Sequence, residues 1–150
     1  MFTHCEVYCL RVIPTFDVPW DELRAMARRA SANSYAPYSR VTVGAAGVNA
    51  QRNFVVGSNV ENASYGLTLC AECSLVSDLA RQGGGRLVAV SIVAGDGEPI
   101  APCGRCRQLL FEHGGAELLV DAGEGVEPTT LATLLPHAFG PDDLGVRRNP

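Results

Sequence analysis

The sequence predicts an α/β protein in which helices cover both faces of a central sheet. Segments with apolar residues at helical spacing alternate along the chain with short β-prone segments, which is the pattern of this fold class. The segment Leu87–Val93 is apolar throughout, as in a strand that is buried on both faces. No internal repeat or linker divides the chain, so we expect a single domain.

The first half of the chain predicts a helix, a hairpin and a second helix. Residues 17–33 begin with a proline among acidic residues and continue with apolar residues at helical spacing, which favours a helix. Val41–Asn49 and Phe54–Val60 are β-prone segments joined by a polar stretch, which indicates a hairpin. Leu69–Gln82 has the pattern of a helix, and the three glycines at 83–85 end it.

The second half predicts two more strands and two more helices. Leu87–Val93 is the buried strand, and a glycine-rich turn follows it. Gly104–Glu112 predicts a helix, and Leu118–Val120 predicts a short strand. Thr129–Leu135 predicts a short final helix that begins with a threonine cap and is followed by a proline.

Composition and charge narrow the class of protein. The chain has 150 residues, of which 47% are hydrophobic and 19% charged, as in folded rather than disordered proteins. The formal net charge of −4 argues against a broad basic surface for nucleic acid. No stretch is long and apolar enough to span a membrane, and the start has no secretory signal pattern. We therefore expect a cytoplasmic protein that binds neither nucleic acid nor membranes.

The N-terminal residues are interpreted as an addition to the domain. Residues 1–16 mix apolar residues, cysteines and charges without a clear period. We expect them to be either a disordered leader or the product of a start codon assigned too far upstream. Residues 17–150 are then the single folded domain.

Cysteines and one glutamate form the most informative pattern in the chain. Cys103 and Cys106 have two residues between them at a predicted helix start, where both sulfurs can bind one ion, and Cys70 supplies a third sulfur from another helix start. Glu72 lies two residues after Cys70, so its carboxylate can face an open fourth position on the metal. Thiolates bind zinc tightly, and a nearby carboxylate can move protons for a water molecule that zinc activates.

Two other interpretations use the same cysteines. Cys73 would complete a four-cysteine structural zinc site, as in a zinc ribbon. The Cys103–Cys106 pair also looks like a thioredoxin-type redox pair. Neither interpretation explains Glu72, and the helical starts of both pairs differ from the hairpin turns of a ribbon.

The segments Cys70-Ala71-Glu72 and Pro102-Cys103-Gly104-Arg105-Cys106-Arg107-Gln108 resemble the ligand segments of the small homotetrameric cytidine deaminases. The resemblance runs from about Pro19 to Phe139. It implies a three-layer α/β/α sandwich with a central mixed sheet, a Zn²⁺ cofactor and active sites at the subunit boundaries of a homotetramer. It also implies that zinc-activated water deaminates cytidine and 2′-deoxycytidine to the uridine nucleosides plus ammonia, as in pyrimidine salvage.

The same resemblance assigns residues that contact the pyrimidine nucleoside. Asn59 and Glu61 correspond to the pair that binds sugar hydroxyls, and the backbone N–H of Ala71 corresponds to the group that meets the base carbonyl. Phe139 resembles the aromatic residue that enters a neighbouring subunit's pocket. Val41 stands where the family usually has a phenylalanine against the base, so we expect a higher KM or altered base tolerance.

Val41 in place of phenylalanine is also consistent with a second kind of deaminase. A deaminase of a modified cytosine nucleoside, of the blasticidin type, shares the segment from Pro102 to Gln108. Cys73 is a further departure, because many family members have an arginine at that position near the zinc ligands.

Overall fold

The elements follow the predicted order around one mixed sheet. A computed structural model describes residues 16–148, with side chains as far as Leu144. The strands lie in the order β2-β1-β3-β4-β5; β3 and β4 are parallel, and the other neighbours are antiparallel. Their bounds are β1 (Val43–Asn49), β2 (Phe54–Ser58), β3 (Leu87–Ala94), β4 (Leu119–Val120) and β5 (Thr129–Thr130).

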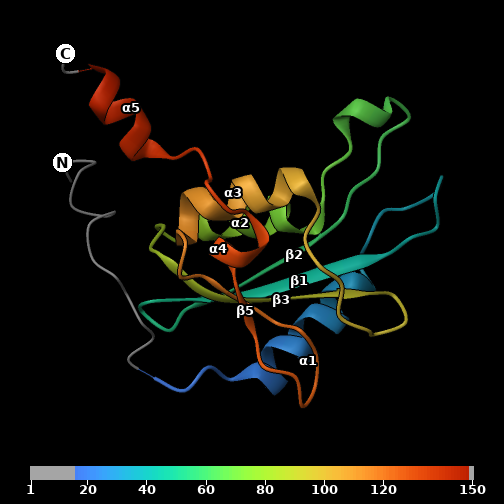
Figure 1. Ribbon diagram of the computed structural model, residues 1–150. Coiled ribbons are helices and arrows are strands. Elements are labelled where there is room, and N and C mark those ends of the chain that lie inside the picture. Colours follow the sequence, from blue (N-terminus) through green and yellow to red (C-terminus); the bar gives the residue numbers. More distant parts are fainter. Residues whose placement is uncertain (1–15, 149–150) are drawn as a thin grey trace.

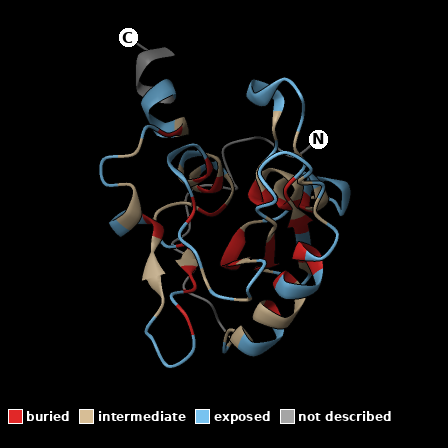
Figure 2. Cartoon of the chain, turned by 90° about the vertical axis from the view of Figure 1, so that its right-hand side faces the viewer, coloured by how far each residue is buried: buried red, intermediate tan, exposed pale blue. Residues whose placement is uncertain are grey.

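Helices cover both faces of this sheet, which confirms the three-layer prediction (Figure 1). Helix α1 (Trp20–Ser31) lies on one face, and α2 (Ala71–Arg81) and α3 (Gly104–Gly114) lie on the other. Each face has its own apolar cluster, and the buried residues in Figure 2 gather where helices meet strands. Leu23 and Ala27 pack with Val48 on the α1 face, while Leu75 and Leu110 pack on the α2 and α3 face.

Two strand glycines let helix backbones approach the sheet. A Cβ at Gly44 would lie 1.9 Å from the carbonyl oxygen of Ala27 in α1. A Cβ at Gly57 would lie 2.3 Å from the carbonyl oxygen of Ala71, the first residue of α2. Real Cβ atoms do not come this close to backbone oxygens, so any side chain at Gly57 would push the start of α2 away from β2.

Among the predicted boundaries that differ from the observed ones, three depend on contacts of the segment from residue 59 to residue 69. Strand β1 begins at Val43 and not at Val41, because the side chain of Asn59 bonds the backbone of both residues. Strand β2 ends at Ser58, and Val60 pairs instead with Leu69 through two backbone hydrogen bonds of 2.9 Å. That pairing holds Leu69 in extended backbone, so α2 begins at Ala71 rather than at Leu69.

The predicted helix at Thr129–Leu135 is shorter in the structure, although Thr130 is its N-cap as predicted. Thr129 and Thr130 pair with Val120 and Leu119 of β4 as strand β5, and only Leu131–Leu134 forms helix α4. The 3-10 helix η1 (Tyr65–Leu67) and the C-terminal helix α5 (Pro141–Arg148) are additional elements that the sequence pattern did not predict.

The predicted N-terminal extension lies almost wholly outside the described residues. Of residues 1–16 only Phe16 is described; it packs against the α1-face cluster, and the guanidinium carbon of Arg52 lies 4.8 Å from its ring centroid. From residue 16 to residue 148, no helix combines the length and the apolar character needed to cross a membrane.

A buried ion pair fastens α1 to the end of β4. Arg24 donates to both carboxylate oxygens of Asp121, at 2.9 and 2.8 Å, and Ser91 of β3 donates to the same carboxylate at 2.8 Å. Burial acts to raise the pKa of Asp121, but these donors and the N–H of Gly123 hold it below its ordinary value of 3.8. The Asp121 side chain is 1% exposed, so its charge depends on these partners.

We expect Asp121→Asn to lower the free energy of unfolding at pH 7 by about 3–5 kcal/mol, because it leaves the Arg24 charge without its buried partner. The stabilisation by the carboxylate is present above its unfolded pKa and is lost as the pH falls through the lowered folded pKa. Urea unfolding from pH 7 to pH 3 measures both effects. Asp21→Asn is the matched control, since the Asp21 side chain is 98% exposed beside the same arginine; it should cost less than about 1 kcal/mol. Equal losses in the two variants would contradict this account.

Candidate functional site

Three cysteine thiols meet where α2 and α3 begin. Cys70 is the N-cap of α2 and Cys103 the N-cap of α3, and Cys106 lies in the first turn of α3. The Sγ atoms of the three residues all lie within 4.8 Å of one another. Both helices begin at the same end of the molecule, on the side of the segment that carries η1 (Figure 1). The two helix starts therefore present three sulfurs to one point in space.

This donor set fits a tetrahedral zinc ion with one position left over. Zinc–sulfur bonds of about 2.3 Å in tetrahedral geometry separate two sulfurs by about 3.8 Å, which lies inside the observed limit. Three protein ligands and an open fourth position are typical of catalytic zinc, whereas structural sites have four. The three cysteines differ in exposure: Cys106 is buried, Cys70 is half-buried and Cys103 is exposed.

The electrostatics of the cluster explain why it needs a cation. Burial raises the pKa of the Cys106 thiol far above its usual range, and the carboxylate of Glu72 adds to the effect. Burial also raises the pKa of Cys70. At Cys103 burial acts in the same direction, but hydrogen bonds, first from the backbone N–H of Cys106, lower the pKa overall. A dication and the positive ends of two helices would together offset the charge of three thiolates.

Glu72 lies against this cluster. Its side chain belongs to the first turn of α2, the residue is 4% exposed, and its carboxylate hydrogen-bonds with the Cys106 thiol. Burial raises the pKa of Glu72 above the ordinary carboxyl value. A carboxyl group that is buried beside the sulfurs and holds its proton more tightly than usual can exchange that proton with a reacting group. Ala71 is the first residue of α2, where a backbone N–H has no acceptor within the helix.

Cys73 is directed to a different partner. The metal-binding group that the described residues form consists of Cys70, Cys103 and Cys106, and does not include Cys73. The guanidinium of Arg105 donates to Cys73 Sγ at 3.3 Å and to the carbonyl oxygen of Thr68 at 3.4 Å. The geometry therefore separates three of the four paired cysteines from the fourth.

Asn59 secures the loop before β1. Its side-chain oxygen accepts from the backbone N–H of Val43 at 2.8 Å, and its side-chain nitrogen donates to the carbonyl oxygen of Val41 at 2.9 Å. The Val41 side chain is 56% exposed on this secured loop. Pairing of Val60 with Leu69 brings the segment that contains Asn59 beside the residue that precedes Cys70.

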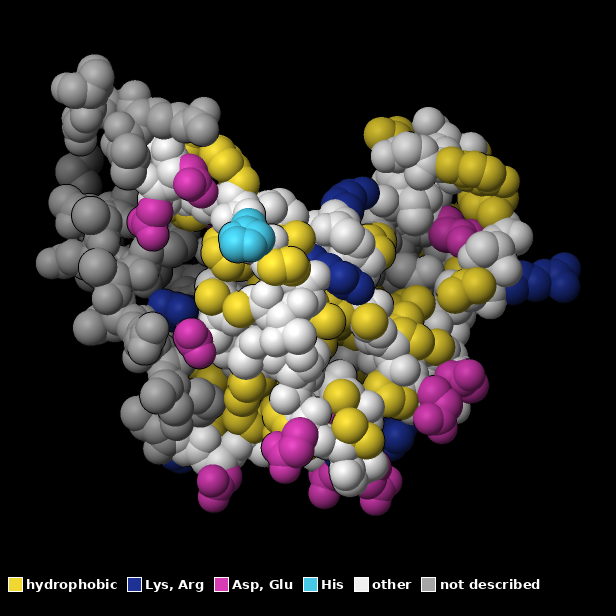
Figure 3. All heavy atoms as spheres, viewed as in Figure 1, with side chains coloured by type: hydrophobic (Ala, Val, Ile, Leu, Met, Phe, Trp, Pro, Cys, Tyr) yellow, Lys and Arg dark blue, Asp and Glu magenta, His cyan; other side chains and the backbone are white. Residues whose placement is uncertain are grey.

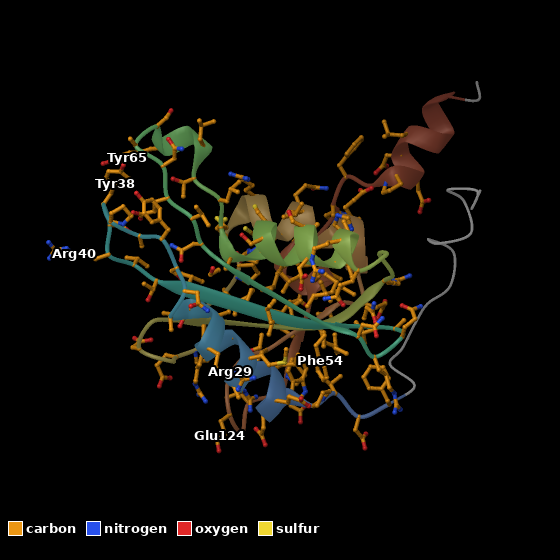
Figure 4. The ribbon with its side chains drawn as sticks, turned by 180° about the vertical axis from the view of Figure 1, so that it is seen from behind. Arg29, Tyr38, Arg40, Phe54, Tyr65 and Glu124 are labelled. Carbon is orange, nitrogen blue, oxygen red and sulfur yellow. The ribbon has the colours of Figure 1, made fainter. Side chains whose placement is uncertain are left out.

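Glu61 binds the same loop from its other side. Its carboxylate accepts from the backbone N–H of Tyr38 at 2.8 Å, and from the backbone N–H and hydroxyl of Ser39. The Ser39 hydroxyl is the main cause that lowers the pKa of Glu61. The carboxylate also lines a pocket of about 220 Å³ with Tyr38 and Tyr65, whose ring centroids are 6.0 Å apart. Figure 4 shows these two tyrosines together at the end of their loops, with Arg40 directed outward.

Phe139 occupies a third position, after α4. Its backbone carbonyl accepts from the side-chain nitrogen of Gln108 in α3 at 2.8 Å, and the residue is 51% exposed. The neighbouring Arg107 donates to the carbonyl oxygens of Pro102 at 2.9 Å and Leu134 at 2.8 Å. The structure thus brings together the three thiols and Glu72, joins Asn59 and Glu61 to the loop that carries Val41, and ties Phe139 to α3 by its backbone.

Two cavities differ in their relation to these groups. Figure 3 shows the surface hollowed between the segment that carries η1 and the C-terminal part of the chain. The cavity of about 600 Å³ beside the start of α5 is larger than the tyrosine pocket; Phe111 and His113 line it, but Glu72 and the thiols do not. The larger of these two cavities therefore lies away from the thiols and Glu72, which are at the helix starts.

Three contributors to the site were not predicted from the sequence. Gly57 allows the start of α2 to approach the sheet, Ser39 binds Glu61, and Gln108 binds the backbone of Phe139. The glycine within a β-prone segment was a usable signal, because such glycines often mark close backbone approach. The partners of Ser39 and Gln108 are distant in sequence and have no local signal.

Comparison with known proteins agrees with this geometry. The family model described as the cytidine and deoxycytidylate deaminase zinc-binding region matches residues 20–121. A cytidine deaminase from Mycobacterium tuberculosis is 56% identical over 128 residues, which cover 85% of this chain and 95% of that protein. A cytidine deaminase from Halalkalibacterium halodurans is 39% identical over 121 residues, which cover 79% of this chain and 92% of that protein.

Solved structures agree on the fold. The crystal structure of the M. tuberculosis cytidine deaminase is similar with a TM-score of 0.79 at 56% identity, and covers 83% of this chain and 99% of that one. The cytidine deaminase from Mycobacterium leprae gives a TM-score of 0.77 at 56% identity, over 81% of this chain and 100% of that one. The sequence match, the fold and the cluster of three thiols with a buried glutamate agree: this chain belongs to the cytidine and deoxycytidylate deaminase family.

Proposed function

We propose that the protein deaminates cytidine and 2′-deoxycytidine hydrolytically, using zinc, to give the uridine nucleosides and ammonia. The observation that carries this proposal is the group of three Sγ atoms within 4.8 Å of one another, with Glu72 buried against them. The relatives at 56% and 39% identity are named cytidine deaminases. Such an activity serves pyrimidine salvage.

In this proposal Cys70, Cys103 and Cys106 would hold Zn²⁺, which would lower the pKa of a bound water molecule toward neutrality. Glu72 then moves the protons. Its buried carboxylate would accept a proton from the attacking water and pass it to the ring nitrogen N3. It would then take the second proton from the hydroxyl added at C4 and deliver it to the amino group, which leaves as ammonia while the C4 carbonyl forms. The backbone N–H of Ala71, free at the helix start, donates to the base carbonyl.

Asn59 and Glu61 are proposed to bind the sugar. Both already bind the loop from Tyr38 to Val43, so sugar hydroxyls would use the acceptor positions of the Glu61 carboxylate that remain, and the second N–H of Asn59. The sugar and the loop would therefore share the same two side chains. This sharing would couple nucleoside binding to the position of Val41 at the base.

The site is proposed to be completed by a second copy of the chain. Phe139 is half exposed, and the segment around η1 exposes Tyr65, Leu67 and Leu69, so apolar surface is available for a neighbouring subunit. We propose a homotetramer in which Phe139 of one subunit contacts the nucleoside of another. A cytoplasmic location is proposed with it, because paired thiols persist as metal ligands in a reducing compartment.

The exposure of Val41 leads to a prediction about base contact. We expect Val41→Phe to lower KM for cytidine about fivefold, because an aromatic ring adds stacking on the pyrimidine. Steady-state kinetics measure this, and Val126→Phe is the matched control, since Val126 is 57% exposed in the loop before β5. An unchanged KM in Val41→Phe would show that Val41 does not face the base. A modified cytosine nucleoside that is turned over faster than cytidine by the wild type would favour the blasticidin-type alternative.

The loss of cytidine absorbance and the zinc content, both measured on wild type and on Cys73→Ser, test the proposed function. We expect about one zinc per chain and full deamination in both proteins, because Cys73 faces Arg105 and not the cluster. Loss of zinc from Cys73→Ser would support the four-cysteine structural site instead. A wild type that binds zinc but leaves cytidine unchanged would contradict the proposed activity.

A further inference from the structure

Two adjacent side chains of α3 reach away from the thiols to the chain after α4. Gln108 donates to the carbonyl oxygen of Phe139 at 2.8 Å, and Arg107 donates to that of Leu134 at 2.8 Å. Arg107 also donates to the carbonyl oxygen of Pro102, the residue before Cys103, at 2.9 Å. The helix that carries two of the three clustered thiols is thereby bonded to both ends of the segment 134–139.

The segment 134–139 forms a turn that its surroundings hold in place. His137 has a φ of 55°, in the left-handed region, where a residue with a side chain costs about 1–3 kcal/mol and persists only when its surroundings hold it. Beyond Phe139, the N–H of Gly140 donates to the carboxylate of Asp143 at 2.8 Å. A Cβ at Gly140 would lie 2.9 Å from Cε1 of Phe111, so the turn also packs closely on α3. The backbone on both sides of Phe139 is fixed.

The ring of Phe139 contrasts with its backbone. The residue is 51% exposed, so this chain holds the backbone in place without covering the ring. An exposed phenylalanine leaves a large apolar area in contact with water, and that area yields binding free energy only when another group covers it. A fixed backbone with an open ring suits the presentation of an aromatic group to another molecule.

We propose that Gln108 is a positioning residue for nucleoside binding, because its hydrogen bond sets where Phe139 meets the substrate of a neighbouring subunit. Arg107 supports the same turn at Leu134. The inference rests on the proposed function, in which Phe139 contacts the nucleoside. It adds a physical link between the helix that carries two thiols in one subunit and the base pocket of the next.

Kinetics of Gln108→Ala, Phe139→Ala and the double variant test the proposal, in zinc-loaded full-length protein with cytidine as substrate. We expect Gln108→Ala to raise KM roughly three- to tenfold, the effect of one lost hydrogen bond, with kcat within about twofold. Gln108→Glu keeps the size but removes the donating amide, so it should behave like Gln108→Ala. The double variant should have the KM of Phe139→Ala alone, because Gln108 acts through that ring.

Gln82→Ala is the matched control. Gln82 also donates from a helix to a phenylalanine backbone carbonyl, that of Phe54 at 3.0 Å, but at the far end of α2. The KM of the Gln82→Ala variant for cytidine should equal that of the wild type. Light scattering and zinc content of every variant separate positioning from loss of assembly or metal.

Three results would overturn the proposal: an unchanged KM in Gln108→Ala, additive KM effects in the double variant, or a fall in kcat with zinc loss. An unchanged KM in Phe139→Ala would overturn it together with the proposed Phe139 contact. Continued cytidine turnover by the wild type would leave the proposed function standing in each case. Failure of the wild type to deaminate cytidine would instead reject the function itself.

Discussion

Glu72→Gln will lower kcat for cytidine by about 10²- to 10⁴-fold while the protein retains about one zinc per chain. Glutamine keeps the shape of the side chain but cannot accept and return a proton. The residue is 4% exposed and contacts the Cys106 thiol, so its carboxylate is placed to act at the cluster. Burial also raises its pKa above that of a solvated carboxyl group. Absorbance kinetics and metal analysis on the same preparation measure both quantities.

Asp78→Asn controls for loss of a carboxylate on the same helix. Asp78 lies six residues after Glu72 on α2. It accepts from the N–H of Val56 and pairs with Arg81. Its replacement should leave kcat within about twofold, because it contributes to packing and not to proton transfer. Full activity of Glu72→Gln would reject the proposed proton carrier, and loss of its zinc would mean that Glu72 acts as a ligand.

Cys106→Ser will release zinc and abolish deamination together. Cys106 is fully buried and its sulfur lies within 4.8 Å of the other two, and a serine oxygen is a poor replacement for a thiolate at zinc. We expect zinc affinity to fall by more than the roughly 10- to 100-fold that loss of an outer-shell partner costs. Titration with a zinc chelator, followed by activity and by thermal unfolding, measures the affinity and its link to stability.

Cys73→Ser is the matched control, because it makes the same chemical change three residues after Cys70. A chelator should lower the melting temperature of the wild type and of Cys73→Ser, since the ion binds the folded state, but should not change that of Cys106→Ser. Undiminished zinc binding by Cys106→Ser would show that the three sulfurs do not hold the ion.

The sequence predicted the chemistry at the helix starts because that part of the site is local. Cys70 and Glu72 lie in one turn, Cys103 and Cys106 lie in another, and glycine, proline and apolar periodicity mark both helices. Their meeting in space followed from the expected sheet with helices on its faces. The structure then separated Cys73 from the cluster, which spacing alone left open.

The parts of the fold and the site that were not predicted depend on contacts between residues that are distant in the sequence. The chain has no periodic signal for such contacts. Strand β5 has two residues and exists because it pairs with β4; its second residue, Thr130, is also the N-cap of α4, and only the cap has a local signal. The bonds of Asn59 and Glu61 to the Tyr38–Val43 loop, and of Gln108 to Phe139, join segments that only the folded chain brings together. Asn59 and Glu61, which the family resemblance assigns to sugar binding, therefore also hold this loop in place.

X-ray absorption at the zinc edge of the wild-type protein distinguishes a zinc ion held by three cysteines from one held by four. We expect three sulfur neighbours at about 2.3 Å and one lighter neighbour, from Cys70, Cys103 and Cys106 with one open position. Four sulfur neighbours would contradict this expectation, because a closed site has no position for a reacting water molecule.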